Sequence, residues 1–483
     1  MNEKLMIGWS EADITPDSLG KKISLYGQYY TRIATGIHSR LKAVVLAVSK
    51  GDQSFINVGL DNTGVMQFFI DSLRAKVVEK EPAIDPKMIF VNVIHTHSSP
   101  SLAIEGVVDI WGDELGESDV LTPEEYIAFT VEIVSDAVVE AWNNRKAGGI
   151  AKAFGNARIG HCRRAVYSNG KAEMYGDTTR PDFIGMEAGE DTGVEMLFTF
   201  DENGKKTGML LNVACPSQVM ESTYVVSSDF AGATRELLKK EYGEDFHTLY
   251  QISPAGCQSP RDLVRHYTTE PDCWHADGVD FLAKRLFDAV KSAELSGIDY
   301  DPVFASKNVE VSLPRRKVTY QAYKAAESEL ARLTAIMPEV EAFEAFCAET
   351  HANEKIDGPG PYDSKLHHFV LIKNEQAVIE RYKDQDARPN IIFDMNVIRL
   401  GDVAIANSPF ELYLYYGQNI KARSKAFQTF LIQLAGCAAG YLPSPEAEQY
   451  GGYGGLIING QVGSDGGYKL ADITVEEINK LFN

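Results

Sequence analysis

An apolar run that ends in two histidines, IFVNVIHTHSSP at residues 89–100, constrains the fold of this chain more than any other stretch. The run predicts a buried strand at 89–94, because prolines bound it on both sides. His95 and His97 would then lie just past the carboxyl end of the strand, where open α/β sheets bind their ligands. Neutral imidazole is the commonest metal ligand in proteins, and a pair can divide metal binding and proton transfer. The motif alone is also typical of histidines that merely satisfy hydrogen bonds at a strand end.

The residues before this strand predict a βαβ unit. Residues 42–60 are typical of a hairpin that turns at Gly51-Asp52. Apolar residues then recur with helical spacing over 65–80. Together with the strand at 89–94, these segments would place His95 at the open end of the unit.

Each of four further predicted strands or hairpins is followed by a residue whose side chain could act in catalysis or bind a metal. They are the strand 209–214 before Cys215, the strand 248–252 before Ser259, the hairpin 390–407 before Glu411, and the strand 429–435 before Tyr441. Three further helices are expected: 123–143 capped by Thr122, 230–242 capped by Asp229, and 412–427. The sequence therefore predicts an α/β fold of layered mixed sheets covered by helices, with the chemistry at strand ends.

Two segments depart from this alternation. Residues 316–385 begin with charged, helix-periodic sequence and include the turn DGPGPY, which predicts an inserted helical segment that could cover the site. The glycine-rich residues 451–467 predict a flexible loop near the site, before a closing helix at 474–482. No boundary is strong enough to split the chain, so we expect a single catalytic domain over 1–483.

Composition narrows the function classes. The 68 Asp and Glu residues exceed the 47 Lys and Arg residues, and this excess argues against nucleic acid as a partner. No segment has the apolar length of a membrane span, and the N-terminal residues lack the apolar core of a signal peptide. We therefore expect a cytoplasmic protein, unless a leader was removed. Its six cysteines show no paired spacing, so reduced thiols are expected.

Eight motifs, taken in order, resemble a known family. They are GWSEADITP, GIHSRLKAVVLAV, IHTHSSP, CRRAVYSNG, CPSQ with VVSSDFAG, AGCQSPRD, RLGDVAIANSPFE and GYLPSPEAEQYGGYGG. The chain resembles the N-terminal catalytic domain of the neutral, non-lysosomal ceramidases, zinc-dependent amidases that cleave the N-acyl bond of ceramide. The resemblance does not extend to the immunoglobulin-like domain that follows in larger members.

The resemblance implies roles for individual residues. His95, Glu411 and Tyr441 match zinc ligands, and Cys215 stands where the family has a second zinc histidine. The matches outside the ligand set are His97 for binding and polarising the amide, Tyr453 for supporting the oxyanion, Arg163 beside the substrate, and Ser259 as the nucleophile. These roles suit the chemistry, because zinc polarises a carbonyl and a serine needs a metal or base to become nucleophilic.

Departures from the family pattern leave alternatives open. Cys215 could bind zinc as a thiolate at about 2.3 Å, could be a nucleophile beside the metal, or could mark loss of the metal. Cys257 replaces an aspartate of the GDxSP pattern, and HTHSSPS lacks the glycine of the family's HTHSGPG.

The function expected from the sequence is zinc-dependent cleavage of an amide in a small or polar substrate. The acidic composition and the charged segment 316–385 favour such a substrate over a long-chain lipid. A hydrolase of glycosides or esters on the same scaffold is one alternative, because a fold does not fix chemistry. Another is a non-catalytic binding protein without the metal. The sequence leaves the oligomeric state open.

Overall fold

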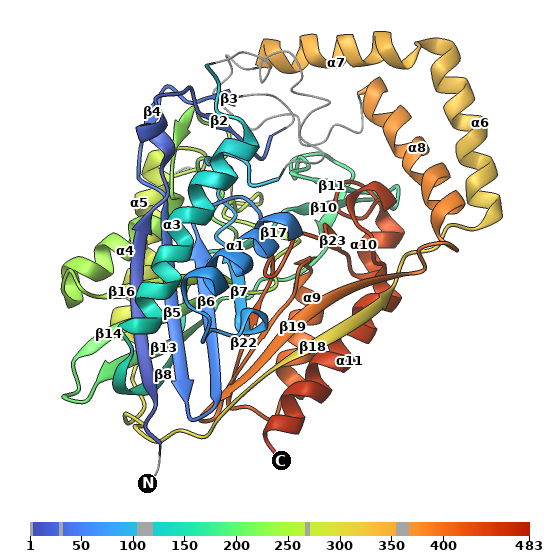
Figure 1. Cartoon of the computed structure of the whole chain (residues 1–483). Helices are drawn as coiled ribbons and strands as arrows, with labels where there is room; N and C mark the ends of the chain where they lie inside the picture. Colours follow the sequence, from blue (N-terminus) through green and yellow to red (C-terminus); the bar gives the residue numbers. More distant parts are fainter. Residues whose placement is uncertain (1–2, 29–31, 104–118, 266–270, 354–366) are drawn as a thin grey trace.

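Two β-sheets stacked face to face form the centre of the molecule (Figure 1). The computed structural model describes residues 3–28, 32–103, 119–265, 271–353 and 367–483. Within these residues the larger sheet has eight strands in the order β16-β14-β13-β8-β1-β5-β6-β7, and the smaller has four in the order β18-β19-β20-β22.

The bounds of the larger sheet's strands, in chain order, are β1 Met6–Asp13, β5 Lys42–Lys50, β6 Gln53–Leu60, β7 Ile89–Val93, β8 Lys146–Asn156, β13 Gly193–Asp201, β14 Lys206–Val213 and β16 His247–Ile252. Those of the smaller sheet are β18 Phe304–Pro314, β19 Asn390–Leu400, β20 Val403–Asn407 and β22 Gln428–Ile432. Three neighbouring pairs run parallel, namely β6 with β7, β14 with β16, and β20 with β22. The predicted hairpins at 42–60 and 390–407 and the strand after residue 88 are confirmed.

Helices cover both outer faces of the stacked sheets (Figure 1). Those over the larger sheet are α1 Gln67–Lys80, α3 Pro123–Asn143, α4 Asp229–Tyr242 and α5 Ala276–Ser292, and those over the smaller are α9 Leu414–Arg423 and α11 Ser464–Leu481. Strand β5 shows why apolar and polar residues do not alternate strictly in the strand sequences. Its Leu46 faces the second sheet while Val45 faces the helices, so both faces are buried. The predicted α/β fold of layered sheets is confirmed.

Helix starts follow local capping chemistry. Thr122 is the N-cap of α3, as the sequence predicts, and it forms a capping box with Glu125. The prediction for α4 differs by one residue, because Ser228 is the N-cap and Asp229 is already helical. The Asp229 carboxylate accepts hydrogen bonds from the backbone N–H groups of Met220 and Phe230. Asp229 therefore ties the loop before α4 to the helix start.

The described residues of the segment 316–385 form three helices, α6 Tyr320–Ile336, α7 Glu339–Asn353 and α8 His368–Asp384. They have a small core of their own, which includes Leu333, Phe346 and Ile372. The DGPGPY turn lies outside the described residues. Strands β18 and β19 pair up to Pro314 opposite Asn390, so the segment leaves and re-enters the sheet at one point. Its role as a cover stays a prediction.

The glycine-rich stretch is more ordered than predicted. A 3₁₀ turn spans Ile457–Asn459, and α11 already begins at Ser464, ten residues before the expected 474 (474 − 464). Gly467 explains this, because a Cβ there would lie 2.3 Å from the Tyr416 ring. The glycine thus permits close packing of α11 on α9, and it does not mark a loop. The α9 helix begins at Leu414 and ends at Arg423, shorter than predicted.

No helix in the described ranges is long and apolar enough to cross a membrane.

Candidate active site

His95 lies two residues beyond β7 in a constrained conformation. Its φ of 62° is in the left-handed region, where a side chain other than glycine is strained. The backbone N–H donates to the Asn62 carbonyl, and Nδ1 lies 2.5 Å from the carbonyl oxygen of Thr63. The carbonyl can only accept, so Nδ1 carries the proton and Nε2 keeps a lone pair. The loop after β6 therefore aims Nε2 of His95 into the site.

His97 packs edge-on against His95, with the two Nε2 atoms 3.2 Å apart. The Gln218 side-chain nitrogen lies 2.7 Å from His97 Nε2, and the Arg32 guanidinium donates to the His97 carbonyl. Burial, and then the electrostatic interaction with His95 and the positive charges of Arg32 and other neighbouring arginines, hold the pKa of His97 well below its ordinary value. His97 is therefore a neutral imidazole.

Glycine 27 lies directly against the His97 ring. Its φ is 117°, and a Cβ at this position would lie 2.4 Å from the ring carbon Cγ. No larger residue fits without moving the imidazole. The backbone around Gly27 is therefore one wall of the site.

Glu411 and Tyr441 are register partners in a short parallel ladder. Strand β21 (Glu411–Leu412) pairs with β23 (Tyr441–Leu442), which places the two side chains next to each other. Glu411 Oε2 lies 3.8 Å from His95 Nε2. Burial, followed by the charge of Glu411, raises the pKa of Tyr441 well above its ordinary value. The phenol thus keeps its proton in this arrangement.

Arg163 connects the carboxylate and the phenol. Its guanidinium donates to the Tyr441 hydroxyl at 3.1 Å and lies 3.8 Å from Glu411 Oε2. It also donates to the Gly256 carbonyl at 3.1 Å. The side chain is buried, so these contacts fix a full positive charge in the site.

Tyr453 packs against Tyr441, with ring centroids 5.6 Å apart and an interplanar angle of 75°. Its backbone carbonyl accepts a hydrogen bond from Arg164, which forms a buried ion pair with Glu187 at 2.8 Å. Arg164 also donates to the Gly451 carbonyl at 2.6 Å. This ion pair therefore anchors the glycine-rich segment that carries Tyr453.

Ser259 lies on β17 (Gln258–Ser259), opposite His161 on β9 (His161–Cys162). Its side chain is fully buried, and Oγ accepts from the backbone N–H of Arg261 at 3.1 Å. Within the described part of the chain, its hydroxyl makes no hydrogen bond to another residue predicted for the site. Its role as the nucleophile stays a prediction.

The Cys215 side chain makes its described hydrogen bonds with the backbone and not with the other predicted ligands. It is fully buried in the core under α4 and α5, and Sγ donates to the carbonyls of Ile159 at 3.5 Å and Pro216 at 3.4 Å. Burial and then the neighbouring Asp229 raise the pKa of this thiol well above its ordinary value. Cys215 is thus a neutral thiol in the core, and no described contact joins it to His95 or Glu411.

The donor set fits zinc in part. Among the residues that the structure describes, no three His, Cys, Asp or Glu side chains form a group that could hold a metal ion. His95 and Glu411 approach to 3.8 Å with Tyr441 beside them, and imidazole and carboxylate are ordinary zinc ligands. The hydrogen bond from His95 to Thr63 is the kind that orients metal-binding histidines. His95, Glu411 and Tyr441 therefore fit the ion, whereas no described contact joins Cys215 to them, and its role as a ligand stays a prediction.

Sequence reasoning missed a buried polar group behind His97. Glu221 pairs with Arg261, whose guanidinium also donates to the Gln218 carbonyl at 2.8 Å and stacks on Trp274. The Tyr175 hydroxyl lies 3.4 Å from Glu221 Oε1. The only sequence signal is position: Gln218 and Glu221 follow Cys215-Pro216, and Arg261 follows Ser259-Pro260.

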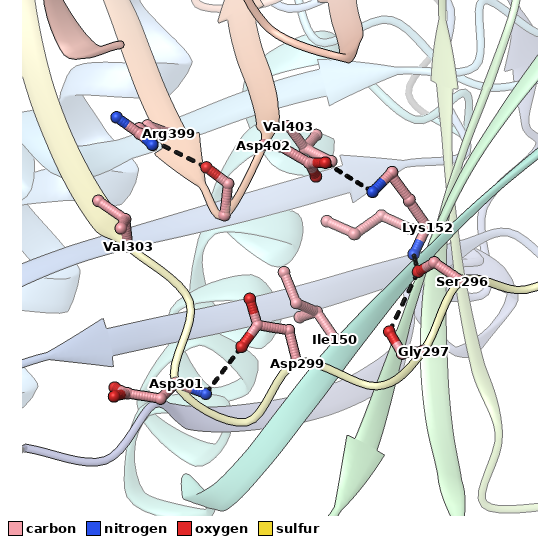
Figure 2. A pocket seen from close by; sticks show the side chains of 12 residues that line it. Ile150, Lys152, Ser296, Gly297, Asp299, Asp301, Val303, Arg399, Asp402 and Val403 are labelled. Carbon is pink, nitrogen blue, oxygen red and sulfur yellow. Dashed lines mark hydrogen bonds and ion pairs between the residues drawn. The ribbon is translucent and has the colours of Figure 1, made fainter. Parts of the chain in front are cut away.

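A hollow of about 510 Å³ lies at the other end of β20, next to the turn at Gly401 and Asp402 (Figure 2). Its charges are already paired. Lys152 contacts Asp402 at 2.6 Å, and Asp299 accepts from the backbone of Asp301 at 3.0 Å. The hollow therefore offers no reactive group comparable to the cluster around His95.

Comparisons with known proteins support the fold. No protein-family model and no curated protein sequence matches the chain. Among solved structures, a ceramidase complexed with C2 aligns with a TM-score of 0.66 over 98% of this chain and 74% of that one, at 16% identity. Neutral ceramidase from Pseudomonas aeruginosa aligns with the same score and identity, over 99% of this chain and 75% of the other. The predicted fold, that of the neutral ceramidase catalytic domain, is confirmed.

Proposed function

We propose that this protein is a zinc-dependent hydrolase that cleaves an amide bond, an N-acyl linkage, in a small or polar substrate. One observation carries the proposal: His95, Glu411, Tyr441 and Arg163 meet at strand ends in a chain with the ceramidase fold. Fold alone does not fix chemistry, so the argument rests on these side chains.

The residues would divide the work as follows. His95, Glu411 and Tyr441 would hold the zinc, which supplies a Lewis acid for the scissile carbonyl. Arg163 keeps Glu411 and Tyr441 in place through its contacts with both. We assign Tyr453 to the developing oxyanion, because a phenol beside Tyr441 is a suitable donor.

Ser259 is proposed as the attacking group. In this arrangement its hydroxyl is buried, with Oγ engaged by the backbone N–H of Arg261. Attack therefore requires local opening of this loop. Cys215 is not proposed as a nucleophile, because its thiol is neutral and hydrogen-bonded to the backbone.

A substrate screen tests the proposal. Purified protein with quantified zinc is incubated with pools of N-acyl amines, esters and glycosides, and the products are identified. We expect an amine and an acid, with little turnover of the other pools. Reducing sugar as the main product, or no turnover by zinc-loaded protein, would contradict the amidase assignment. Ser259→Ala should remove turnover while zinc and fold are kept.

A further inference from the structure

Tyr175 has a strained backbone conformation next to the proposed site. It follows β11 (Ala172–Met174) and has a φ of 52°, in the left-handed region that residues other than glycine seldom adopt. Its backbone N–H donates to the Arg163 carbonyl at 2.7 Å. Conformations of this kind persist only where the surrounding structure holds them, and they concentrate at functional sites. The position of Tyr175 is therefore set by its contacts and not by its local preference.

Three charged side chains converge on the Tyr175 hydroxyl. Nη1 of Arg163 lies 3.5 Å from the hydroxyl oxygen, and Nη1 of Arg261 lies 3.3 Å from it. Oε1 of Glu221 lies 3.4 Å from the same oxygen. A guanidinium N–H only donates and a carboxylate only accepts, so the phenol accepts from both arginines and donates to Glu221. One hydroxyl therefore connects the two guanidinium groups to each other.

Arg163 is the arginine that contacts the proposed zinc ligands. Its Nη2 donates to the Tyr441 hydroxyl at 3.1 Å and lies 3.8 Å from Glu411 Oε2. Its Nη1 is the atom that faces Tyr175. The two ends of one planar guanidinium group therefore face the proposed ligands and Tyr175. Because the group is rigid, a shift at one end also moves the other.

Arg261 belongs to the polar group behind His97. Its guanidinium donates to the Gln218 carbonyl at 2.8 Å, and the Gln218 side chain contacts His97 Nε2 at 2.7 Å. The guanidinium also lies 3.1 Å from the centre of the Trp274 ring, and it is fully buried. A displacement of Arg261 would therefore reach His97 through a single glutamine.

We propose that Tyr175 is a positioning residue of the hydrolysis: its hydroxyl holds Arg163 and Arg261 at a fixed separation and so sets the spacing between the proposed zinc ligands and His97. This inference rests on the proposed function. The scissile amide would contact both sides, because zinc polarises its carbonyl and His97 has the binding role that the family resemblance implies. The contacts of 3.3 and 3.5 Å are long for hydrogen bonds, and contacts in active sites often shorten when substrate binds.

Tyr175→Phe tests the proposal, because it keeps the ring and removes only the hydroxyl. A misplacement of the reacting groups by about 1 Å can cost about 100-fold in rate. We therefore expect the kcat for an N-acyl substrate to fall about 10–100-fold, while KM changes less than about twofold. Zinc content and the urea unfolding midpoint should stay unchanged. A kcat within about twofold of wild type, or a loss that only follows a lower unfolding midpoint, would overturn the proposal.

Tyr415→Phe is the matched control. Tyr415 lies on α9, and its hydroxyl lies 2.7 Å from the Tyr468 hydroxyl, so the same atom is removed from a hydrogen-bonded tyrosine outside the proposed site. This variant should keep its kcat, and an equal loss would contradict the role of Tyr175. If Tyr175→Phe does not fold, Tyr175→Asn replaces it, because asparagine adopts the left-handed conformation readily and its side chain ends short of the phenol hydroxyl. The same loss of kcat is expected.

A measurement without substrate separates this inference from the proposed function. In ¹⁵N-arginine-labelled protein, the side-chain NMR signals of Arg163 and Arg261 are assigned from the spectra of Arg163→Lys and Arg261→Lys. Tyr175→Phe should speed hydrogen exchange at both guanidinium groups, and Tyr415→Phe should not. Unchanged exchange would overturn the positioning role even if an amide is cleaved. If no amide is cleaved, the proposed function fails, while the exchange rates still decide whether Tyr175 holds the two arginines.

Discussion

The loops after β7 and β14 each follow a strand that belongs to a parallel pair, yet their conspicuous residues make different kinds of contact. The loop after β7 turns through the left-handed conformation of His95 and exposes Nε2 to Glu411. The loop after β14 buries Cys215 under α4 and α5 and extends Gln218 and Glu221 toward His97 instead. Position after a strand therefore brings a residue near the site, but the local backbone and burial decide which side chain enters it.

The largest expected effect is a difference in zinc content between variants of His95 and of Cys215. His95→Ala should lose most of its zinc. Even removing a hydrogen-bond partner of a metal ligand costs about 10–100-fold in affinity. Cys215→Ala should keep its zinc, because the thiol is bonded to backbone carbonyls. Elemental analysis of both variants checks this. Equal zinc loss in the two would restore Cys215 to the ligand set.

The second largest effect is expected for Gly27→Ala, which should displace the His97 ring. The new methyl would meet the His97 ring, and a φ of 117° is strained for alanine. We expect a loss of about 1–3 kcal/mol in unfolding free energy, a marked loss of kcat, and retained zinc. Gly20→Ala is the control, because Gly20 has a φ of 66° but no neighbour within 4 Å of the added methyl. Similar activity losses in both variants would mean that backbone strain, and not the His97 contact, is responsible.

The alkylation rate of Cys215 is expected to change little with metal. Burial keeps the thiol protonated, and the thiolate is the reactive form. Iodoacetamide should therefore label Cys215 slowly with and without a chelator, and more slowly than the half-buried Cys347, as mass spectrometry would show. Labelling that accelerates only after chelation would identify a metal ligand. Rapid labelling of the zinc-loaded enzyme with loss of activity would identify a nucleophile.

The smallest expected effect is a change in stability from an ion pair next to the β9–β17 ladder, which contains Ser259. His161, opposite Ser259, contacts Glu190 at 2.7 Å. Burial raises the pKa of Glu190, but hydrogen bonds from His161 and Arg158 outweigh it and lower the pKa from 4.5 to about 2. A lowered folded-state pKa stabilises the fold above about pH 4.5, and that contribution is lost as the pH falls toward 2.

Glu190→Gln should accordingly lower the unfolding free energy at pH 7 by about 1 kcal/mol. The difference from wild type should shrink in acid, because protonation removes the same charge from the wild type. Urea unfolding at pH 7 and near pH 3 tests this. A difference that does not change with pH would contradict the assignment of the stabilising charge to Glu190.

The sequence predicts most of the fold because the strands and helices follow local rules. The hairpin turn at Gly51-Asp52 and the capping box of α3 depend on neighbouring residues alone. The extent of α11 was missed because Gly467 is explained only by its contact with Tyr416, 51 residues earlier (467 − 416). Glycine in a sequence does not distinguish a flexible loop from a tightly packed helix.

The candidate site could be predicted only in part, for a similar reason. The family resemblance indicates His95, Glu411 and Tyr441, which the structure brings together. The Cys215 thiol donates to the Ile159 carbonyl, 56 residues away in sequence. The pairing of Glu221 with Arg261 likewise depends on how two loops meet. Such contacts leave no local pattern in the sequence.

The segment between β18 and β19 has a consequence for the evolution of this chain. Pro314 and Asn390 are ladder partners, so a short turn could join them while the strand register stays unchanged. Helices can therefore be gained, lengthened or lost at this junction without altering the sheet. Such changes are limited by Arg315 and Arg381, because both side chains donate to Gln461. Gln461 lies eight residues after Tyr453 (461 − 453). Under the proposed function, a change in the insertion would reach Tyr453 through two arginines and one glutamine, while the proposed zinc ligands stay in place.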